Sequence, residues 1–81
     1  MNPTATEDVE ISERFRKTIE DRVARLEQDA AQDEAQIRRL ANPDHIRRQM
    51  RLVAVQRGEV LRLRLFLAQV KTRLPRPLIK L

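Results

Sequence analysis

The sequence predicts an all-α protein: a two-helix antiparallel hairpin, with helices over about residues 5–41 and 43–74 and an extended C-terminal tail. Three observations support this prediction. The 81 residues are rich in Ala, Leu, Arg, Glu and Gln and contain one Gly and four Pro, a composition that favours helix. Apolar residues recur at helical spacing in two long segments. One strong break, at residues 41–44, separates these segments.

The first helix is expected to begin near residue 5. Thr4 and Glu7 have the spacing of a capping box, and Asp8 and Glu10 add negative charge close to the positive end of the helix dipole. The apolar residues of this segment follow steps of three, four and seven and define one narrow stripe. Asp33 takes a position that this spacing would otherwise make apolar. The stripe consists of Ile11, Phe15, Ile19, Val23, Leu26, Ala30, Ile37 and Leu40.

The second helix is expected to begin at the break and to end near Leu74. Asn42 can cap it, Pro43 can take the first helical position, and Asp44 can face the positive end of the dipole. Two prolines in the segment that follows prevent its continuation, which divides the chain into a hairpin, residues 1–74, and a tail. Its apolar seam matches that of the first helix and consists of Ile46, Met50, Val53, Val60, Leu63, Leu67, Val70 and Leu74.

Residues 60–67 allow a second interpretation. Their leucines alternate with period two, as in a half-buried strand. However, Leu and Arg are strong helix formers, and no turn signal closely bounds the run. The helical interpretation is therefore favoured.

The second helix carries more apolar surface than the first can cover. Excluding Ala, positions 1–41 hold nine hydrophobic residues and positions 42–81 hold sixteen. Full burial of one Leu or Phe is worth about 1.5 to 3 kcal/mol, which is a large share of the stability of a small domain. A second copy or a partner protein is therefore expected to cover this helix. The residues outside the seam are Ala54, Gly58, Leu61, Leu65 and Ala68 on one side and Leu52, Val55 and Phe66 on another.

The predicted partner-binding residues lie in this helix and in the tail, residues 75–81. The Pro-x-Pro spacing of the tail favours an extended chain, and three of its last four residues are large aliphatics. The tail is either a disordered end or a segment that docks into a neighbouring subunit. The predicted partner-binding set is Leu61, Leu65, Phe66, Ala68, Leu78 and Ile79.

The net charge of +5 divides unequally, with −3 in positions 1–41 and +8 in positions 42–81. In an antiparallel hairpin, acids of the first helix would lie level with arginines of the second, and such pairs fix orientation more than they stabilise. The expected level pairs are Glu34 with Arg51, Glu27 with Arg57, and Asp21 with Arg64. The basic residues left for phosphates or an acidic partner are Arg47, Arg48, Arg62, Arg73, Arg76 and Lys80.

A sequence pI near 11 is typical of nucleic-acid-binding proteins. Against this class, the basic residues are interleaved with large apolar ones, and there is no Tyr or Trp on which a base could stack. Binding at a membrane surface is disfavoured, because Arg62 and Arg64 project to different sides of the helix. No charge-free stretch is long enough to span a bilayer, and the N-terminus lacks the pattern of a signal peptide. The expected location is the cytoplasm or the interior of an assembly.

The sequence offers no arrangement of residues suited to catalysis, to metal binding or to a cofactor. His45 and Ser12 are the only residues of their types and fall on opposite helices. Asp29 and Asp33 could present two carboxylates to a divalent ion, but no His or Cys accompanies them, so Asp33 is interpreted as a register device or a contact to an arginine. Gly58 is the only glycine, which excludes a Gly-rich phosphate loop, and it either permits close approach of another helix or weakens its own.

The leading hypothesis is a non-enzymatic helical-hairpin subunit that assembles with itself or acts as an adaptor in a larger complex, such as a phage particle or a secretion machine. The alternative is a nucleic-acid-associated protein that contacts the phosphate backbone through its basic second half. Neither function calls for a cofactor.

Overall fold

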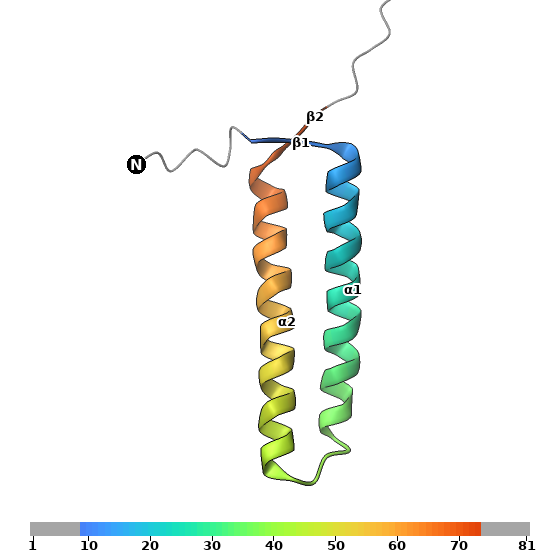
Figure 1. The fold of residues 1–81 in the computed structure, drawn as a ribbon, viewed down its shortest axis with the longest axis vertical. Helices are drawn as coiled ribbons and strands as arrows, with labels where there is room; N and C mark the ends of the chain where they lie inside the picture. The colour runs from blue at the N-terminus through green and yellow to red at the C-terminus, as the bar shows by residue number, and fades with distance from the viewer. Residues whose placement is uncertain (1–8, 74–81) are drawn as a thin grey trace, which may run out of the picture.

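A computed structural model describes residues 9–73, which form an antiparallel pair of long helices (Figure 1). Helix α1 spans Glu13–Ile37 and helix α2 spans Pro43–Gln69. At the end away from their connection, strand β1 (Glu10–Ser12) pairs with strand β2 (Lys71–Arg73). The predicted hairpin is confirmed, and residues 60–67 are helical. The short strand pair was not predicted.

Helix α1 begins at Glu13 rather than near residue 5. The Ser12 Oγ accepts a hydrogen bond from the Phe15 N–H at 3.1 Å, so Ser12 is the N-cap. The predicted helix is wrong for residues 10–12, because these residues are extended and pair with β2. The predicted capping box at Thr4 lies outside the described residues.

Helix α2 begins as the sequence predicts. The Asn42 side chain accepts a hydrogen bond from the Asp44 N–H at 2.9 Å, and Pro43 takes the first helical position. The helix ends at Gln69, earlier than predicted, because Val70 is already extended and leads into β2. Val and Thr are β-branched and tolerate extended backbone, and the pairing of β2 with β1 holds the chain extended there, before the prolines are reached. The predicted tail, residues 75–81, lies outside the described part of the chain.

The strands are parallel because both cross the same end of the hairpin in the same direction (Figure 1). Strand β1 runs into the start of α1, while β2 leaves the end of α2 and runs towards α1. Glu10 pairs with Lys71, and the Lys71 N–H donates to the Val9 carbonyl at 3.0 Å. Ile11 and Val70 are buried at this end. The strand pair therefore closes the end of the hydrophobic core.

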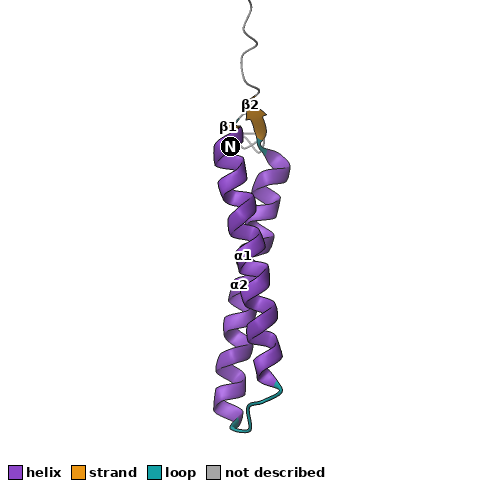
Figure 2. Cartoon of the chain, turned by 90° about the vertical axis from the view of Figure 1, so that its right-hand side faces the viewer, coloured by secondary structure: helices purple, strands orange, loops and turns teal. Residues whose placement is uncertain are grey.

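The core lies between the two helices. Ile19, Val23 and Val60 form its central cluster, in the half nearer the strands, and Leu26, Leu63, Phe66 and Leu67 pack against it. Ala30 and Val53 are buried in the half nearer the connection. Seen edge-on, the hairpin is a single layer of two helices (Figure 2). Both broad faces of this layer are therefore uncovered by any other helix of residues 9–73.

Two residues predicted in the apolar seams are instead on the surface. Phe15 is 50% exposed and Met50 is 56% exposed. The residues that face the opposite helix are their neighbours: Arg16 lies three residues before the buried Ile19, and Gln49 lies four before the buried Val53. Residues three or four apart lie on the same side of a helix, so the spacing allowed either Phe15 or Arg16, and either Met50 or Gln49, to face the opposite helix. The prediction that the apolar residue of each pair does so was wrong.

A polar group interrupts the core at Asp33. The Gln56 Nε2 donates to the Asp33 Oδ2 at 2.8 Å, and the Gln49 Nε2 donates to the Asp33 carbonyl oxygen at 3.0 Å. The Gln56 Oε1 is buried and accepts no hydrogen bond from the described residues. Asp33 therefore contacts glutamines of the facing helix rather than an arginine, and such a polar layer can fix the register of two helices.

Gly58→Ala is expected to stabilise the hairpin by about 0.5 to 1 kcal/mol, because Gly is a poor helix former. A Cβ added at Gly58 would meet no atom of the described residues within 4 Å, and the φ of Gly58 is not positive. The methyl group therefore fits without strain. Thermal unfolding followed by circular dichroism should give a higher Tm. A lower Tm would mean that another molecule occupies the space above Gly58.

Candidate protein interface

Helix α2 exposes large apolar side chains on sides that do not face α1. Their exposed fractions range from 43% to 61%, and they are Met50, Leu52, Val55, Leu61 and Leu65. Between residues 13 and 37, Phe15 is the one large hydrophobic residue exposed to this degree. The apolar excess of the second helix is thus present on the surface of this single chain.

The predicted partner-binding residues do not all share one surface. Leu61, Leu65 and Ala68 are exposed and lie at spacings of four and three, so they follow one side of α2. Phe66 is half-buried and packs against the core cluster. The exposed stripe continues at the same spacing towards the connection, and its residues, named here the outer stripe, are Ala54, Gly58, Leu61, Leu65 and Ala68. Leu78 and Ile79 lie outside the described residues.

One broad face of the hairpin carries ion pairs between the helices and is named here the ion-pair face. The Arg57 Nη2 lies 3.0 Å from the Glu34 Oε1, and the Arg64 Nη2 lies 2.6 Å from the Glu27 Oε1. All four side chains are about half exposed, between 46% and 59%. Pairs in such surroundings contribute about 0 to 1 kcal/mol each, so this face sets the alignment of the helices more than their stability.

These pairs correct the predicted level pairs. Glu34 contacts Arg57 rather than Arg51, and Glu27 contacts Arg64 rather than Arg57. The cause is the lean of helical side chains towards the N-terminus of their own helix. In this antiparallel pair, side chains of α1 lean towards the strand end and side chains of α2 lean towards the connection. An acid of α1 and an arginine of α2 therefore lean towards each other only when the arginine is attached nearer the strand end than the acid. The partners are therefore six and seven residues further along α2 than the predicted ones.

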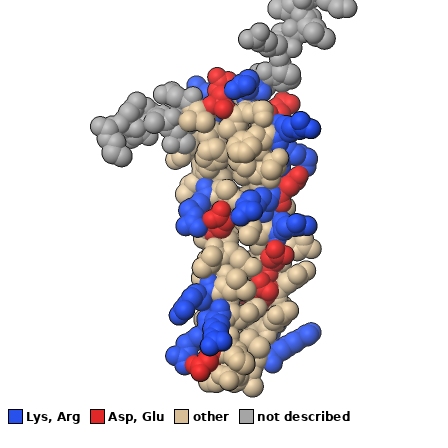
Figure 3. Space-filling model, in the orientation of Figure 1, with Lys and Arg blue, Asp and Glu red and all other residues tan. Residues whose placement is uncertain are grey.

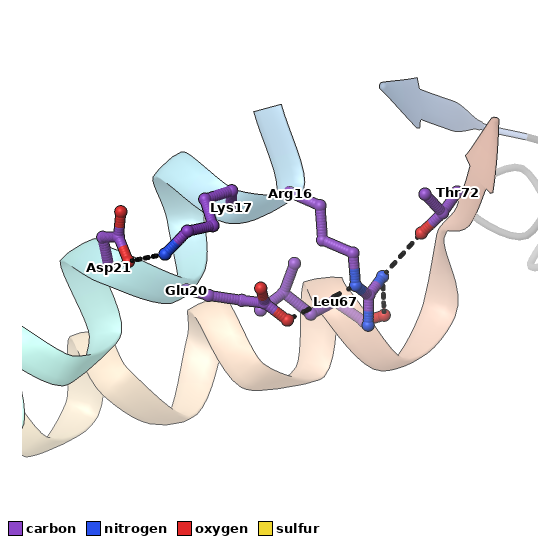
Figure 4. A network of polar contacts seen from close by, with 6 residues as sticks. All are labelled: Arg16, Lys17, Glu20, Asp21, Leu67 and Thr72. Carbon is purple, nitrogen blue, oxygen red and sulfur yellow. Dashed lines mark hydrogen bonds and ion pairs between the residues drawn. The ribbon is translucent and has the colours of Figure 1, made fainter. Parts of the chain in front are cut away.

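Asp21, the third acid of the predicted level pairs, contacts its own helix. Its Oδ1 accepts from the Lys17 Nζ at 2.9 Å (Figure 4). This hydrogen bond and the charge of the carboxylate raise the pKa of Lys17, while both side chains stay exposed. Because Asp21 is four residues after Lys17, the contact is local to α1 and does not align the two helices.

The opposite broad face is marked by the Asp33–Gln56 contact and is named here the aromatic face. Two rows with a seven-residue repeat border it: Phe15, Arg22 and Asp29 on α1, and Leu52, Glu59 and Phe66 on α2. In its half nearer the strands, Leu26, Leu63 and Phe66 are only half-buried by the hairpin. Figure 3 shows an area without charged side chains that spans both helices just below the strand pair.

The predicted phosphate-contacting residues are spread along the molecule. Arg47 lies 3.2 Å from Asp44, Arg62 lies 2.9 Å from Glu59, and Arg73 lies 4.0 Å from Glu10. Arg47, Arg48 and Arg51 line a shallow hollow with Asp44 near the connection, where Figure 3 shows basic side chains gathered on α2. Arg48 and Arg62 are fourteen positions apart, which corresponds to about 21 Å along the helix. Arg76 and Lys80 lie outside the described residues.

Arg16 joins three elements at the strand end of the hairpin (Figure 4). Its Nη1 donates to the Leu67 carbonyl oxygen at 3.3 Å and to the Thr72 Oγ1 at 3.1 Å, while its Nε lies 3.5 Å from Glu20. It thereby satisfies a carbonyl near the end of α2 and holds β2 against α1. This role of Arg16 was not predicted from the sequence. The sequence did contain an indication of it, because Arg16 is three residues before Ile19 and so lies on the same side of α1 as that core residue.

The structure separates the two residues considered for catalysis. Ser12 caps α1 at the strand end, and His45 lies in the first turn of α2 at the other end. Among residues 9–73, no three or more His, Cys, Asp or Glu side chains are grouped as metal ligands would be. Neither α1 nor α2 has an apolar stretch of the length needed to cross a membrane.

Comparison of the chain with protein-family models, with curated proteins and with solved structures found no match. The candidate interface is therefore defined by its own residues. It comprises the outer stripe on the free side of α2, which borders the ion-pair face, and the aromatic face on the other side of the hairpin.

Proposed function

We propose that the chain is a non-enzymatic helical-hairpin subunit that binds itself or a partner protein, with α2 as the main contact helix. The observation that carries this proposal is the exposure of Leu61 (60%) and Leu65 (53%) on the outer stripe. Removing apolar surface from water yields about 25 cal/mol per Å². The spacing of the stripe, alternately four and three, is also the pattern on which a further helix packs.

Charge indicates what kind of surface fits the outer stripe. Helix α2 contains six arginines and two acids, Asp44 and Glu59. Two α2 helices packed on their outer stripes would bring like charges together, which destabilises such pairs. The partner of the outer stripe is therefore expected to be a helical surface flanked by acidic residues.

Leu65→Glu is expected to weaken assembly by roughly tenfold or more in Kd while the chain stays helical, because it places a charge in the apolar stripe. Size-exclusion chromatography with light scattering over a range of concentrations measures the assembly, and circular dichroism measures the helicity. Gln69→Glu is the matched control, since it adds the same charge at an exposed position of the same helix. Wild-type-like assembly of the Leu65 variant would place the interface elsewhere.

The alternative function, contact with nucleic-acid phosphates, is supported by one feature: the arginines at positions 47, 48 and 51, gathered near the connection. Phosphate contacts release counterions, so binding should weaken steeply as salt increases. Fluorescence anisotropy with labelled duplex DNA tests this at several salt concentrations. Absence of binding at low salt would exclude the alternative, and a steep salt dependence would support it.

A further inference from the structure

We propose that residues 78–81 of a second copy of this chain dock on a small apolar patch of the aromatic face, so that copies are joined through their tails. The patch, named here the strand-end patch, consists of Phe15, Leu63 and Phe66. This inference rests on the proposed function and deepens it, because it assigns an occupant to a surface separate from the outer stripe.

The strand-end patch is the part of the aromatic face that carries no charge. Phe15 is 50% exposed, and Leu63 and Phe66 are half-buried by the core of their own hairpin. In Figure 3 this is the area just below the strand pair. Towards the connection it ends at the level of Arg22 and Glu59. Its exposed surface is therefore apolar, and covering it removes no charged group from water.

The strand-end patch is short enough for an extended segment to cover it. Phe15 and Arg22 are seven positions apart, which corresponds to about 10 Å along α1, and four residues of extended chain span about 13 Å. Asp29 and Asp33 follow Arg22 by at least a further seven residues. A four-residue segment therefore covers the patch and leaves both carboxylates in water, whereas a whole hairpin laid on this face would bury them.

Residues 78–81 have the side-chain pattern that such a patch requires. Side chains alternate between the two sides of an extended chain, so Ile79 and Leu81 share one side while Lys80 lies on the other. The two aliphatic side chains can then contact Phe15 and Phe66 while the Lys80 ammonium group stays in water. The apolar area of the segment and that of the patch leave water together, which favours docking.

The sequence before this segment directs it away from its own hairpin. Strand β2 runs from the end of α2 across the hairpin towards α1 (Figure 1). The third residue of a type I turn lies near the α region, which a residue before proline avoids and where a proline is disfavoured, and a type II turn needs Gly or Asn there. Every residue from 74 to 77 is a proline or precedes one. Residues 74–77 therefore favour an extended spacer of about 12 Å, which presents residues 78–81 to another copy.

Cross-linking tests this contact, and it is specific because the chain contains no Cys. In the full chain with Arg22→Cys and Lys80→Cys, a flexible bismaleimide should link position 22 of one copy to position 80 of another. The control combines Ala24→Cys with Lys80→Cys. Ala24 is exposed on the opposite side of α1 at nearly the same height, because two residues correspond to about 200° of rotation. Docking raises the effective concentration of the two thiols, so the covalent dimer should form in roughly tenfold higher yield than in the control.

Mass spectrometry of the linked peptides identifies the joined positions. A bridge between positions 22 and 80 of one chain would show that the tail docks on its own hairpin, and equal dimer yields in the two variants would show that it does not dock on the strand-end patch. Either result overturns the inference. If the cross-link fails while Leu65→Glu still weakens assembly, the inference fails and the proposed function stands. If the cross-link forms while Leu65→Glu has no effect, the inference stands and the outer stripe is the wrong surface.

A double-mutant cycle tests the same contact without new thiols. Phe15→Ser and Ile79→Asp should each weaken self-association roughly tenfold or more in Kd, because each removes apolar surface from the contact. The variant with both changes should be no weaker than the weaker single variant, since both remove the same contact. Sedimentation equilibrium gives the Kd, and circular dichroism should show an unchanged helix content. Losses that multiply, or a wild type that is monomeric at all concentrations, would overturn the proposal.

Discussion

Val60→Asp is expected to unfold the hairpin, whereas Val55→Asp leaves it folded. Val60 is 8% exposed and belongs to the central core cluster with Ile19 and Val23, while Val55 is 61% exposed on the same helix. An unpaired buried charge costs several kcal/mol, and a core of this size rarely supplies more than about 3 to 5 kcal/mol. The same change of residue therefore has opposite outcomes at two positions five residues apart.

Far-ultraviolet circular dichroism and urea denaturation measure this difference. The Val60 variant should lose most of its helical signal at 25 °C, and the Val55 variant should keep the urea midpoint of the wild type to within a small shift. Equal loss of helix in both variants would show that α2 is buried on its outer side even in solution, as in an obligate oligomer. Equal stability of both would mean that the core is not where the structure places it.

Asp33→Leu combined with Gln56→Leu is expected to raise the free energy of unfolding by about 1 to 3 kcal/mol. The Gln56 Oε1 is buried without a donor among the described residues, and a buried unsatisfied acceptor costs about 1 to 3 kcal/mol. Two leucines in its place add apolar burial worth about 1.5 to 3 kcal/mol each when complete. These gains exceed the loss of one hydrogen bond to a carboxylate, about 1.5 to 3 kcal/mol.

The two single variants complete this test. Gln56→Leu alone leaves the Asp33 carboxylate without its donor, and Asp33→Leu alone leaves the whole Gln56 amide unpaired, so each should gain less than the pair. Chemical denaturation of all four proteins gives the coupling energy. If the double variant is less stable than the wild type, the polar layer stabilises the hairpin as well as aligning it.

The parts of the fold that depend on neighbouring residues were predicted from the sequence. Asn42, Pro43 and Asp44 begin a helix through contacts within one turn, and the structure shows this start. The strand pair was missed because it joins residues about 60 positions apart, and three-residue strands have no periodic pattern. Phe15 and Met50 were assigned to the seams because hydrophobicity alone cannot distinguish a seam position from its neighbour.

The candidate interface, like the fold, was predicted only in part from the sequence. The exposure of Leu61 and Leu65 followed from an apolar excess that can be counted in the sequence. The position of Phe66 against the core depends on the rotation of α2 relative to α1, which the pattern did not fix. The ion-pair partners depended on the lean of side chains, and the role of Arg16 depended on a strand pair that was not predicted.

The direction of the two strands determines how the chain responds to tension. Strand β1 enters from one side of the hairpin and β2 leaves towards the opposite side (Figure 1). A force applied to residues 9 and 73 therefore slides the strands past each other along their length and loads their hydrogen bonds simultaneously. Antiparallel strands in the same place would peel apart one bond at a time. In a component under mechanical stress, the strand pair would therefore resist the force and keep the two helices from being pulled apart.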